Sequence, residues 1–230
     1  ILAGNEENKE NSYLAIRTGF PSNIHRHSDD FSFEWSEKGQ VILQDSGRYS
    51  YDYNDPYRIF VSSTKSHNTV TINDSNFPWW GDFSKKDFYT GAVTSYQGNS
   101  KNAKIQLEKN FTKLEVSFNR LLEIQRGKSL QIIDKLVSQN LNDYEQWFHL
   151  SEDFEYLGIN DKNRLVFESS KLRIEVVTPE NTETIVVKGQ KDPYLQGWVS
   201  YSEKKIIPRW SFGFKVKAIS FRFNTKIILV

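Results

Sequence analysis

The sequence predicts an all-β fold, a large antiparallel β-sandwich with many strands and little helix. Short segments of alternating apolar and polar residues recur along the chain, separated by turn residues, which is the pattern of half-buried strands. Aromatic residues make up 14% of the chain, and flat rings pack well on a pleated sheet. No stretch has a clear helical period, and strands in direct succession favour antiparallel pairing over βαβ units.

The first 72 residues hold four candidate strands. They cover 13–20, 31–35, 41–43 and 68–72. Apolar residues alternate over 31–35, as a strand with one buried face requires. Residues 37–40 are typical of a hairpin turn to the following strand, and Asp-Ser-Gly at 45–47 ends that strand. Residues 74–100 are looser and contain several Ser, Gly and Asn.

From Ala103 onward the sequence predicts strand after strand. The candidate strands are 104–109, 112–118, 120–126, 129–138, 145–150, 164–168, 171–178, 183–188, 196–202, 212–222 and 225–230. Turn residues such as Gly127 and Pro179 separate them. We expect one domain over residues 1–230, with a sub-domain seam near 74–102, and the sequence contains no internal repeat.

The composition excludes several functional classes. Thirty basic and 29 acidic side chains give a net charge of +1, which argues against a general nucleic-acid binder. The chain has no Cys, so disulfides, zinc–thiolate sites and cysteine nucleophiles are excluded. No apolar run approaches the roughly 18 residues of a membrane helix. The chain also has no Met, from which we expect a processed chain or an excised part of a longer protein.

Histidines carry the candidate chemistry. His25 and His27 form a His-x-His pair, and on a strand positions i and i+2 face the same side. Asp45 ends the next strand after a hairpin, which can bring it close to His27, and His67 opens a further strand. Two imidazoles and a carboxylate are ligands that suit Zn²⁺, with water or another group completing the coordination.

Each of these residues also has an ordinary structural explanation. A His-x-His pair often only hydrogen-bonds a turn, and Asp-Ser-Gly at 45–47 is a common turn sequence. His67, ahead of Asn-Thr-Val, can simply cap a strand. His149 lies far from the other histidines and is better explained as a satisfied histidine of the core or of an interface. Periodicity alone therefore leaves the metal site open.

Four linked sequence blocks give a more specific indication. The blocks are His25-x-His27-x-Asp29-x-Phe31-Ser32-Phe33 followed by Gly39, Leu43-x-Asp45-Ser46-Gly47-x-Tyr49-x-Tyr51, Arg58, and His67-Asn68-Thr69-Val70. In this order and spacing they resemble the C-terminal domain of the heparinase II/III-like polysaccharide lyases. Those lyases cleave acidic polysaccharides such as heparin, heparan sulfate and alginate oligomers. The blocks lie within residues 13–72, and the rest of the chain is similar only as a series of antiparallel strands.

The resemblance implies a role for each matching residue. His25 takes the place of a catalytic histidine that faces the substrate. The implied metal ligands are His27, Asp45 and His67. Asp29 and Asn68 are expected beside the ligands, where such residues orient them. The ion is expected to be Zn²⁺, with Ca²⁺ or another divalent ion as the alternative, and its implied role is mainly structural.

The implied reaction is β-elimination at a uronic acid. A base removes the proton at C5, beside the carboxylate, and the 4-O-linked sugar leaves. The family's N-terminal helical toroid supplies a Tyr and an Asn or His, and this toroid is absent from the sequence. We therefore expect an acidic polysaccharide and the toroid as partners, and little or no activity of the fragment alone. A secreted, periplasmic or cell-surface location in a bacterium is expected.

Three further residues are candidates for sugar contact. Arg58 can bind a carboxylate or sulfate through paired hydrogen bonds, or form a structural salt bridge. Trp79 and Trp80 can stack on sugar rings, or pack in the core. Two other functions stay open: a non-catalytic carbohydrate-binding module, and a structural metal-stabilised domain in cell-surface polysaccharide assembly. Retention of His25 favours the lyase, since a pure binder has no need of it.

Overall fold

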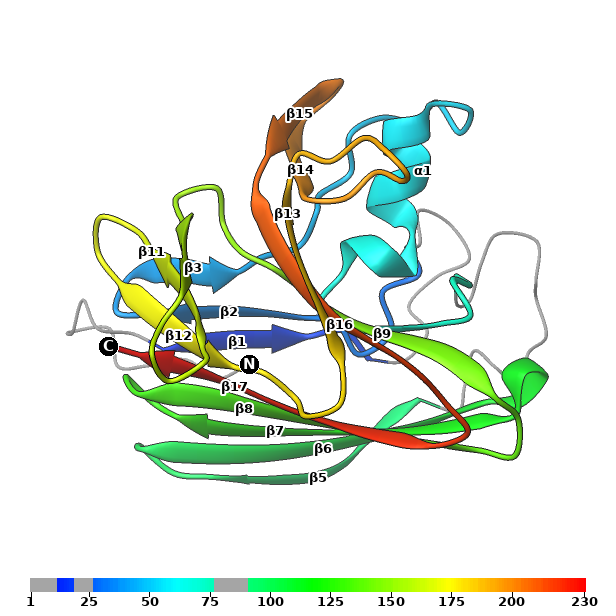
Figure 1. Ribbon diagram of the computed structural model, residues 1–230, viewed down its shortest axis with the longest axis horizontal. Coiled ribbons are helices and arrows are strands. Elements are labelled where there is room, and N and C mark those ends of the chain that lie inside the picture. The colour runs from blue at the N-terminus through cyan, green and yellow to red at the C-terminus, as the bar shows by residue number, and fades with distance from the viewer. Residues whose placement is uncertain (1–11, 19–26, 77–90) are drawn as a thin grey trace.

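The computed structural model describes residues 12–18, 27–76 and 91–230 and confirms the all-β sandwich (Figure 1). The described strands are β1 (Tyr13–Ile16), β2 (Phe33–Glu37), β3 (Gln40–Leu43), β4 (Val70–Ile72), β5 (Ala92–Gly98), β6 (Asn102–Phe111), β7 (Val116–Gln125), β8 (Ser129–Ser138), β9 (Asn142–His149), β10 (Glu155–Ile159), β11 (Leu165–Glu168), β12 (Arg173–Val177), β13 (Glu183–Lys188), β14 (Trp198–Ser202), β15 (Lys205–Pro208), β16 (Trp210–Ala218) and β17 (Phe221–Leu229). The described helices are α1 (Pro56–Ser62) and the 3₁₀ turns η1 (Thr64–Ser66) and η2 (Thr112–Leu114).

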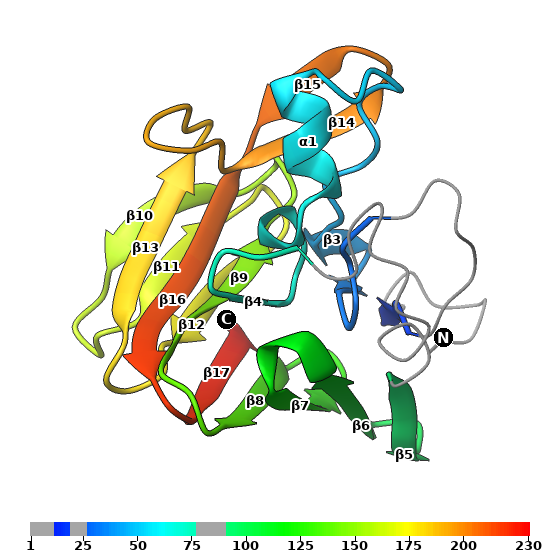
Figure 2. The ribbon, with the colours of Figure 1, turned by 90° about the vertical axis from the view of Figure 1, so that its right-hand side faces the viewer.

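The described strands form four antiparallel sheets. Their orders are β10-β11-β12-β17-β8-β7-β6-β5, β13-β16-β9-β4, β1-β2-β3 and β14-β15. In Figure 1 the long strands β5 to β8 and β17 form the lower layer, and β1 to β3, β9 and β16 lie above it; Figure 2 shows the same layers after a quarter turn. Apolar side chains from the facing sheets merge into one large core, which is how a sandwich buries both inner faces.

Burial along the strands follows their place in the layers. In β6 and β7 buried and more exposed side chains alternate almost strictly, as expected for strands with one face on the core. In β9, an inner strand between β4 and β16, nearly every side chain is buried, so both faces of this strand are covered. Polar side chains of β9, such as Gln146 and His149, are therefore fully buried and need partners inside the protein.

The predicted strands 112–118 and 120–126 are wrong in their boundaries. Residues 112–114 form η2, and one continuous strand, β7, follows. Glu115 has a φ of 55° and ends the 3₁₀ turn in the left-handed region, so the chain reverses there. Asn119, at the predicted break, is paired with strands on both sides.

The predicted strands 212–222 and 225–230 are also misplaced. The chain turns between β16 and β17, near Ser220, four residues earlier than the predicted break near Asn224. Asn224 lies inside β17, where its Oδ1 accepts a hydrogen bond from Gln131 Nε2 at 2.8 Å. A polar residue on the outer face of a strand thus resembled a turn in the sequence.

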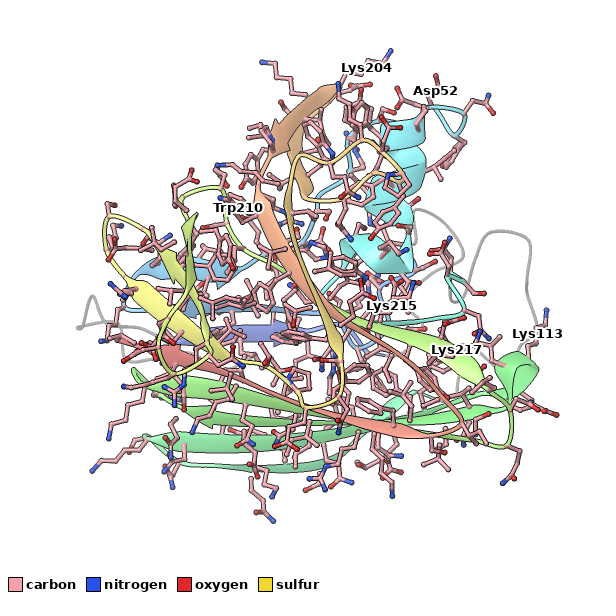
Figure 3. All side chains as sticks on the ribbon, viewed as in Figure 1. Asp52, Lys113, Lys204, Trp210, Lys215 and Lys217 are labelled. Carbon is pink, nitrogen blue, oxygen red and sulfur yellow. The ribbon has the colours of Figure 1, made fainter. Side chains whose placement is uncertain are left out.

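Three strands were not predicted, namely β5, β10 and β15. β5 is the outer strand of the eight-stranded sheet and is exposed along almost its whole length. Such a strand has no apolar face and gives no alternation to read. Lys204 lies at the tip of the β14–β15 hairpin and points outward (Figure 3), and Lys205 begins β15.

The short helix α1 was also not predicted, although the sequence contains a recognisable helix start. Asp55 is the N-cap, its Oδ1 accepts a hydrogen bond from Tyr57 N at 2.8 Å, and Pro56 occupies the first turn. An Asp followed by Pro is a recognised helix start, but seven residues are too few to show a helical period. Among the described helices, none has the length and apolar character to cross a membrane.

Candidate metal centre

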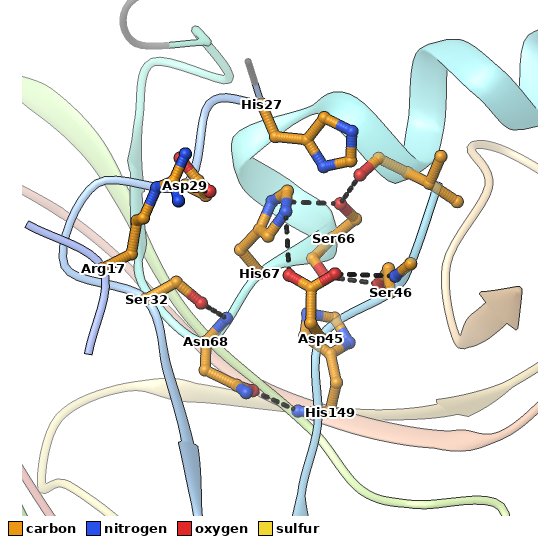
Figure 4. A network of polar contacts seen from close by, with 12 residues as sticks. Arg17, His27, Asp29, Ser32, Asp45, Ser46, Ser66, His67, Asn68 and His149 are labelled. Carbon is orange, nitrogen blue, oxygen red and sulfur yellow. Dashed lines mark hydrogen bonds and ion pairs between the residues drawn. The ribbon is translucent and has the colours of Figure 1, made fainter. Parts of the chain in front are cut away.

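The three predicted ligands come together from three separate connections. His27 precedes β2, Asp45 follows β3, and His67 follows η1. One possible ligand atom from each of the three side chains lies within 4.8 Å of the others. Figure 4 shows the two imidazoles and the carboxylate facing a common point. The same-side argument for His25 and His27 required an extended strand; in the structure His27 lies in an irregular segment.

His67 is held in the orientation that a metal ligand needs. Its Nδ1 lies 2.7 Å from the carbonyl oxygen of Ser63. A carbonyl only accepts hydrogen bonds, so Nδ1 carries the proton and the lone pair of a neutral ring is on Nε2. Nε2 is buried, lies 3.2 Å from Asp45 Oδ2, and makes no hydrogen bond to any described residue. A buried, unsatisfied nitrogen beside a carboxylate oxygen fits a bound divalent ion.

Asp45 presents one oxygen to His67 and uses the other to hold its own turn. Oδ1 accepts a hydrogen bond from Gly47 N at 2.7 Å, which leaves Oδ2 facing His67. Gly47 has a φ of 74°, and a Cβ there would lie 1.9 Å from the carbonyl oxygen of Ser200. Only glycine fits this turn, which explains the Asp-Ser-Gly sequence physically.

His27 has a competing partner. Arg58, on α1, donates from Nη1 to His27 Nε2 at 3.0 Å. The sequence predicted that Arg58 contacts a sugar carboxylate or sulfate or forms a salt bridge; in the structure its guanidinium is buried and contacts a histidine. A neutral imidazole has a single lone pair, so His27 cannot coordinate an ion while Nε2 accepts from Arg58.

The electrostatics of the cluster favour a cation. Burial, together with the nearby His67 and Arg58, lowers the pKa of His27 to about 3, so this ring is neutral near pH 7. Burial opposes a charge on His67, but Asp45 overcomes this and raises the pKa of His67. Burial likewise opposes the charge of Asp45, yet His67 and the Gly47 N–H hold the pKa of Asp45 below its usual value. A divalent ion between Nε2 of His67 and Oδ2 of Asp45 would take the place of a proton on that nitrogen.

Asn68 fixes the backbone beside His67. It is fully buried, its Nδ2 donates to the carbonyl oxygen of Phe33 at 2.8 Å, and its Oδ1 accepts from His149 N at 2.7 Å. Its own carbonyl oxygen accepts from Arg120 Nη1 at 2.7 Å. Asn68 therefore ties the His67 segment to β2, β9 and the eight-stranded sheet, without a hydrogen bond to a predicted ligand among the described residues.

A pocket of about 480 Å³ opens beside the cluster. His27, Asp45, Asp29, Glu34 and Arg17 are among its lining residues. Asp29 Oδ2 lies 3.3 Å from Arg17 Nε. Asp29 is thus paired with an arginine and forms no hydrogen bond to a histidine ring among the described residues, although its charge helps to raise the pKa of His67. Asp45 keeps 37% of its side chain exposed, so the cluster is accessible from this pocket.

His149 is a core histidine, as the sequence suggests, but it is not fully satisfied. Its ring is completely buried, and Nδ1 lies 2.7 Å from Ser211 Oγ. Its Nε2 has no hydrogen-bond partner among the described residues. Burial, with the charge of Arg209 nearby, lowers the pKa of His149 well below its usual value, so the ring is neutral.

Other predicted residues cannot be placed. His25, Trp79 and Trp80 lie outside the described residues. Conversely, no motif or periodicity in the sequence points to Arg120 or Arg209. Both arginines are fully buried and donate to backbone carbonyls at or next to the predicted ligands. Each lies far along the chain from the four sequence blocks within residues 13–72.

Comparisons with known proteins agree with the fold. The family model described as heparinase II/III-like, C-terminal, matches residues 6–226. The heparan sulfate lyase HepC from Pedobacter heparinus superposes with a TM-score of 0.78 at 16% identity, over 96% of this chain and 33% of that one. The heparinase III BT4657 gene product gives 0.79 at 17%, over 98% and 33%. This chain thus spans about a third of each lyase. No curated protein matches it by sequence.

Proposed function

Since this chain belongs to the heparinase II/III-like C-terminal family, we propose that it is the β domain of a lyase that cleaves uronic-acid-containing polysaccharide by β-elimination. The structures similar to it include a heparan sulfate lyase, which supports an acidic polysaccharide as the substrate. Because this chain spans about a third of such lyases, we infer that an N-terminal helical toroid completes the active site.

One observation carries the proposal. Three side chains chosen from the sequence, His27, Asp45 and His67, lie with their ligand atoms within 4.8 Å of one another, although 40 positions separate the first from the last. The proton of His67 is directed away from the cluster by Ser63. Nε2 of His67 is buried, lies 3.2 Å from Asp45 Oδ2 and has no hydrogen-bond partner among the described residues, and an ion between these two atoms would satisfy both.

The donor set fits Zn²⁺ better than Ca²⁺. Two imidazole nitrogens and one carboxylate oxygen are typical zinc ligands, whereas Ca²⁺ takes six to eight oxygen atoms. When bound, the ion would hold the three ligand segments together and neutralise the carboxylate of Asp45. Because the ion would lie between Nε2 of His67 and Oδ2 of Asp45, which are 3.2 Å apart, it would compete with protonation of that nitrogen, and we expect binding to weaken as the pH falls.

In the proposed reaction the chain's own residues prepare the uronate for proton loss. His25 is the proposed base for the C5 proton of one uronate epimer, since a histidine titrates near neutral pH. The negative charge that develops on the uronate carboxylate needs a positive partner. Arg17 offers a guanidinium that is 43% exposed at the pocket, and Arg58 becomes a second candidate once it leaves His27.

Metal analysis of the purified chain tests the ion. We expect about one equivalent of zinc in the wild type and far less in His27→Ala, Asp45→Ala and His67→Ala. The matched control is His149→Gln, which alters a buried histidine outside the cluster and is expected to keep the ion. A wild-type chain without bound metal, at a supplied excess of Zn²⁺, would contradict the proposed site.

An absorbance assay for the unsaturated uronate product tests the reaction. The chain alone is expected to show little or no turnover on heparan sulfate, and the longer protein that includes the toroid is expected to be active. His25→Ala in the longer protein should lose most of the activity and keep its metal. An inactive longer protein that still binds the polysaccharide would favour the carbohydrate-binding alternative instead.

A further inference from the structure

A buried arginine from the last third of the chain holds the turn that carries Asp45. Arg209 lies between β15 and β16 and is completely buried. Its Nη1 donates to the carbonyl oxygens of Gln44 at 2.9 Å and Asp45 at 3.1 Å, and its Nη2 donates to Ser46 Oγ at 2.5 Å. One guanidinium therefore fixes three successive residues, the second of which is a candidate ligand.

Ser46 extends this contact to the segment of the second ligand. While its Oγ accepts from Arg209, it donates to the carbonyl oxygen of Ser66 at 2.5 Å. Ser66 directly precedes His67, and both serines are completely buried. The chain Arg209–Ser46–Ser66 thus connects the two segments whose side chains, Asp45 and His67, face each other at 3.2 Å; Figure 4 shows the two serines beside that pair.

The charge of Arg209 has no carboxylate to which it hydrogen-bonds among the described residues. Its acceptors are two carbonyls and a hydroxyl. Burial lowers the pKa of Arg209 to about 10, so the group remains charged at neutral pH. A buried cation without a paired anion is unfavourable, and the carboxylate of Asp45, on the same turn, is the first charge that offsets it. A buried arginine at position 209 is therefore not explained by a gain in the stability of the fold.

A second, independent clamp holds the same turn by its backbone. Ser200 N donates to the carbonyl oxygen of Ser46 at 3.0 Å, and Gly47 packs directly on Ser200. Arg209 is itself anchored, because its backbone N donates to the carbonyl oxygen of Gly197 at 2.8 Å. The turn consequently stays near β14 even if the side-chain contacts of Arg209 are lost, and only its finer position is free to change.

We propose that Arg209, acting through Ser46, is a positioning residue that sets the separation of Asp45 and His67 and thereby the affinity of the site for a divalent ion. This inference rests on the proposed metal site. Arg209 touches neither ion nor substrate; it fixes the backbone on either side of the two ligands. A planar guanidinium can serve several acceptors at once in fixed directions, which a lysine cannot reproduce.

The sharpest test removes the single hydroxyl that joins the two segments. Ser46→Ala is compared with Ser200→Ala, a buried serine against the same turn whose Oγ donates to the carbonyl oxygen of Ser202 instead. Zinc affinity is measured by competition with a chromophoric chelator, and the unfolding of both metal-free variants is measured in parallel. We expect Ser46→Ala to weaken zinc binding at least tenfold and Ser200→Ala to stay within twofold of the wild type.

Arg209→Lys and Arg209→Met supply a second measurement, the absorption spectrum of bound Co²⁺, which reports the geometry of its ligands. We expect a changed spectrum and weaker binding in both, with partial rescue by lysine. Normal zinc affinity in Ser46→Ala, or equal losses in Ser46→Ala and Ser200→Ala, would overturn the inference and leave the metal site intact. A wild type that binds no Zn²⁺ or Co²⁺ would instead remove the metal site, and the inference with it.

Discussion

The candidate metal centre is held by two buried arginines that work in different ways. Arg120, on β7, forms two hydrogen bonds to Asp134 directly opposite on β8, at 2.7 and 2.6 Å, and both side chains are completely buried. It also donates to the carbonyl oxygens of Phe31 and Asn68. Arg209, between β15 and β16, donates from its side chain to two carbonyls and a hydroxyl and to no carboxylate among the described residues.

Because their partners differ, we expect Arg120 to stabilise the fold and Arg209 to affect the binding of the ion. On the sheet side the charges of Arg120 and Asp134 cancel, and Asp134 also accepts from Gln146 Nε2 at 2.7 Å. This closed network joins the two layers of the sandwich. Arg209 has no such hydrogen-bonded anion among the described residues, and the carboxylate of Asp45 is the first charge that offsets it. We therefore expect changes at Arg120 to affect mainly folding, and changes at Arg209 to affect mainly the ion.

Breaking the pair on the sheet side has the largest expected effect. Arg120→Met leaves Asp134 buried without its cation, and loss of one partner of such a pair typically removes about 3–5 kcal/mol from the free energy of unfolding. Chemical denaturation of the metal-free protein measures this loss. The double variant Arg120→Met/Asp134→Leu should lose less than the two single losses added together. Purely additive losses would mean that the two side chains do not depend on each other.

Removing a ligand should have a smaller effect that depends on the ion. With free zinc at a hundredfold excess over its dissociation constant, the bound ion adds about 2.7 kcal/mol to the stability of the folded state. We expect a chelator to lower the melting temperature of the wild type and to leave that of His67→Ala nearly unchanged. A similar response of both proteins to the chelator would show that the ion, if bound, does not use His67.

The pH dependence of the metal-free protein should report its buried neutral histidines. The folded-state pKa values of His149 and His27 are lowered, so below pH 6.5 the unfolded chain binds protons that the folded protein does not. Stability must therefore fall as the pH falls, by at most about 1.4 kcal/mol per pH unit for each group. His67, whose pKa is raised, acts in the opposite sense and loses its contribution only as the pH rises above 6.5.

Denaturation at several pH values between about 6 and 4 isolates the part of His149. In His149→Gln the slope of stability against pH should be shallower than in the wild type by up to about 1.4 kcal/mol per unit. Gln can still hydrogen-bond to Ser211, which contacts the native ring, so the fold is expected to persist. Identical slopes in the two proteins would mean that His149 is charged or solvated in the folded state.

The sequence predicts the fold class and the three candidate ligands, but not the buried arginines that contact the segments on which these ligands lie. Regular alternation predicts strands with one buried face, and the prediction for 129–138 coincides with β8. The turn that carries Asp45 could be predicted because only glycine fits at position 47, where a Cβ would collide with the carbonyl oxygen of Ser200. In contrast, Arg209 contacts Ser46 across 163 positions, and neither its neighbours nor any periodicity mark it. β5 was missed for a related reason, because an exposed edge strand shows no apolar face.

The smallest expected effect concerns Arg58 on α1, whose removal should strengthen zinc binding. Arg58 donates to His27 Nε2 at 3.0 Å and so competes with an ion for the lone pair of a neutral ring. Arg58→Met, of similar length and without a donor, should bind zinc a few times more tightly than the wild type, whereas Arg209→Met should bind it more weakly. The same chelator competition measures both. Weaker zinc binding in Arg58→Met would mean that Arg58 strengthens the binding of the ion, as is proposed for Arg209, and does not compete with it.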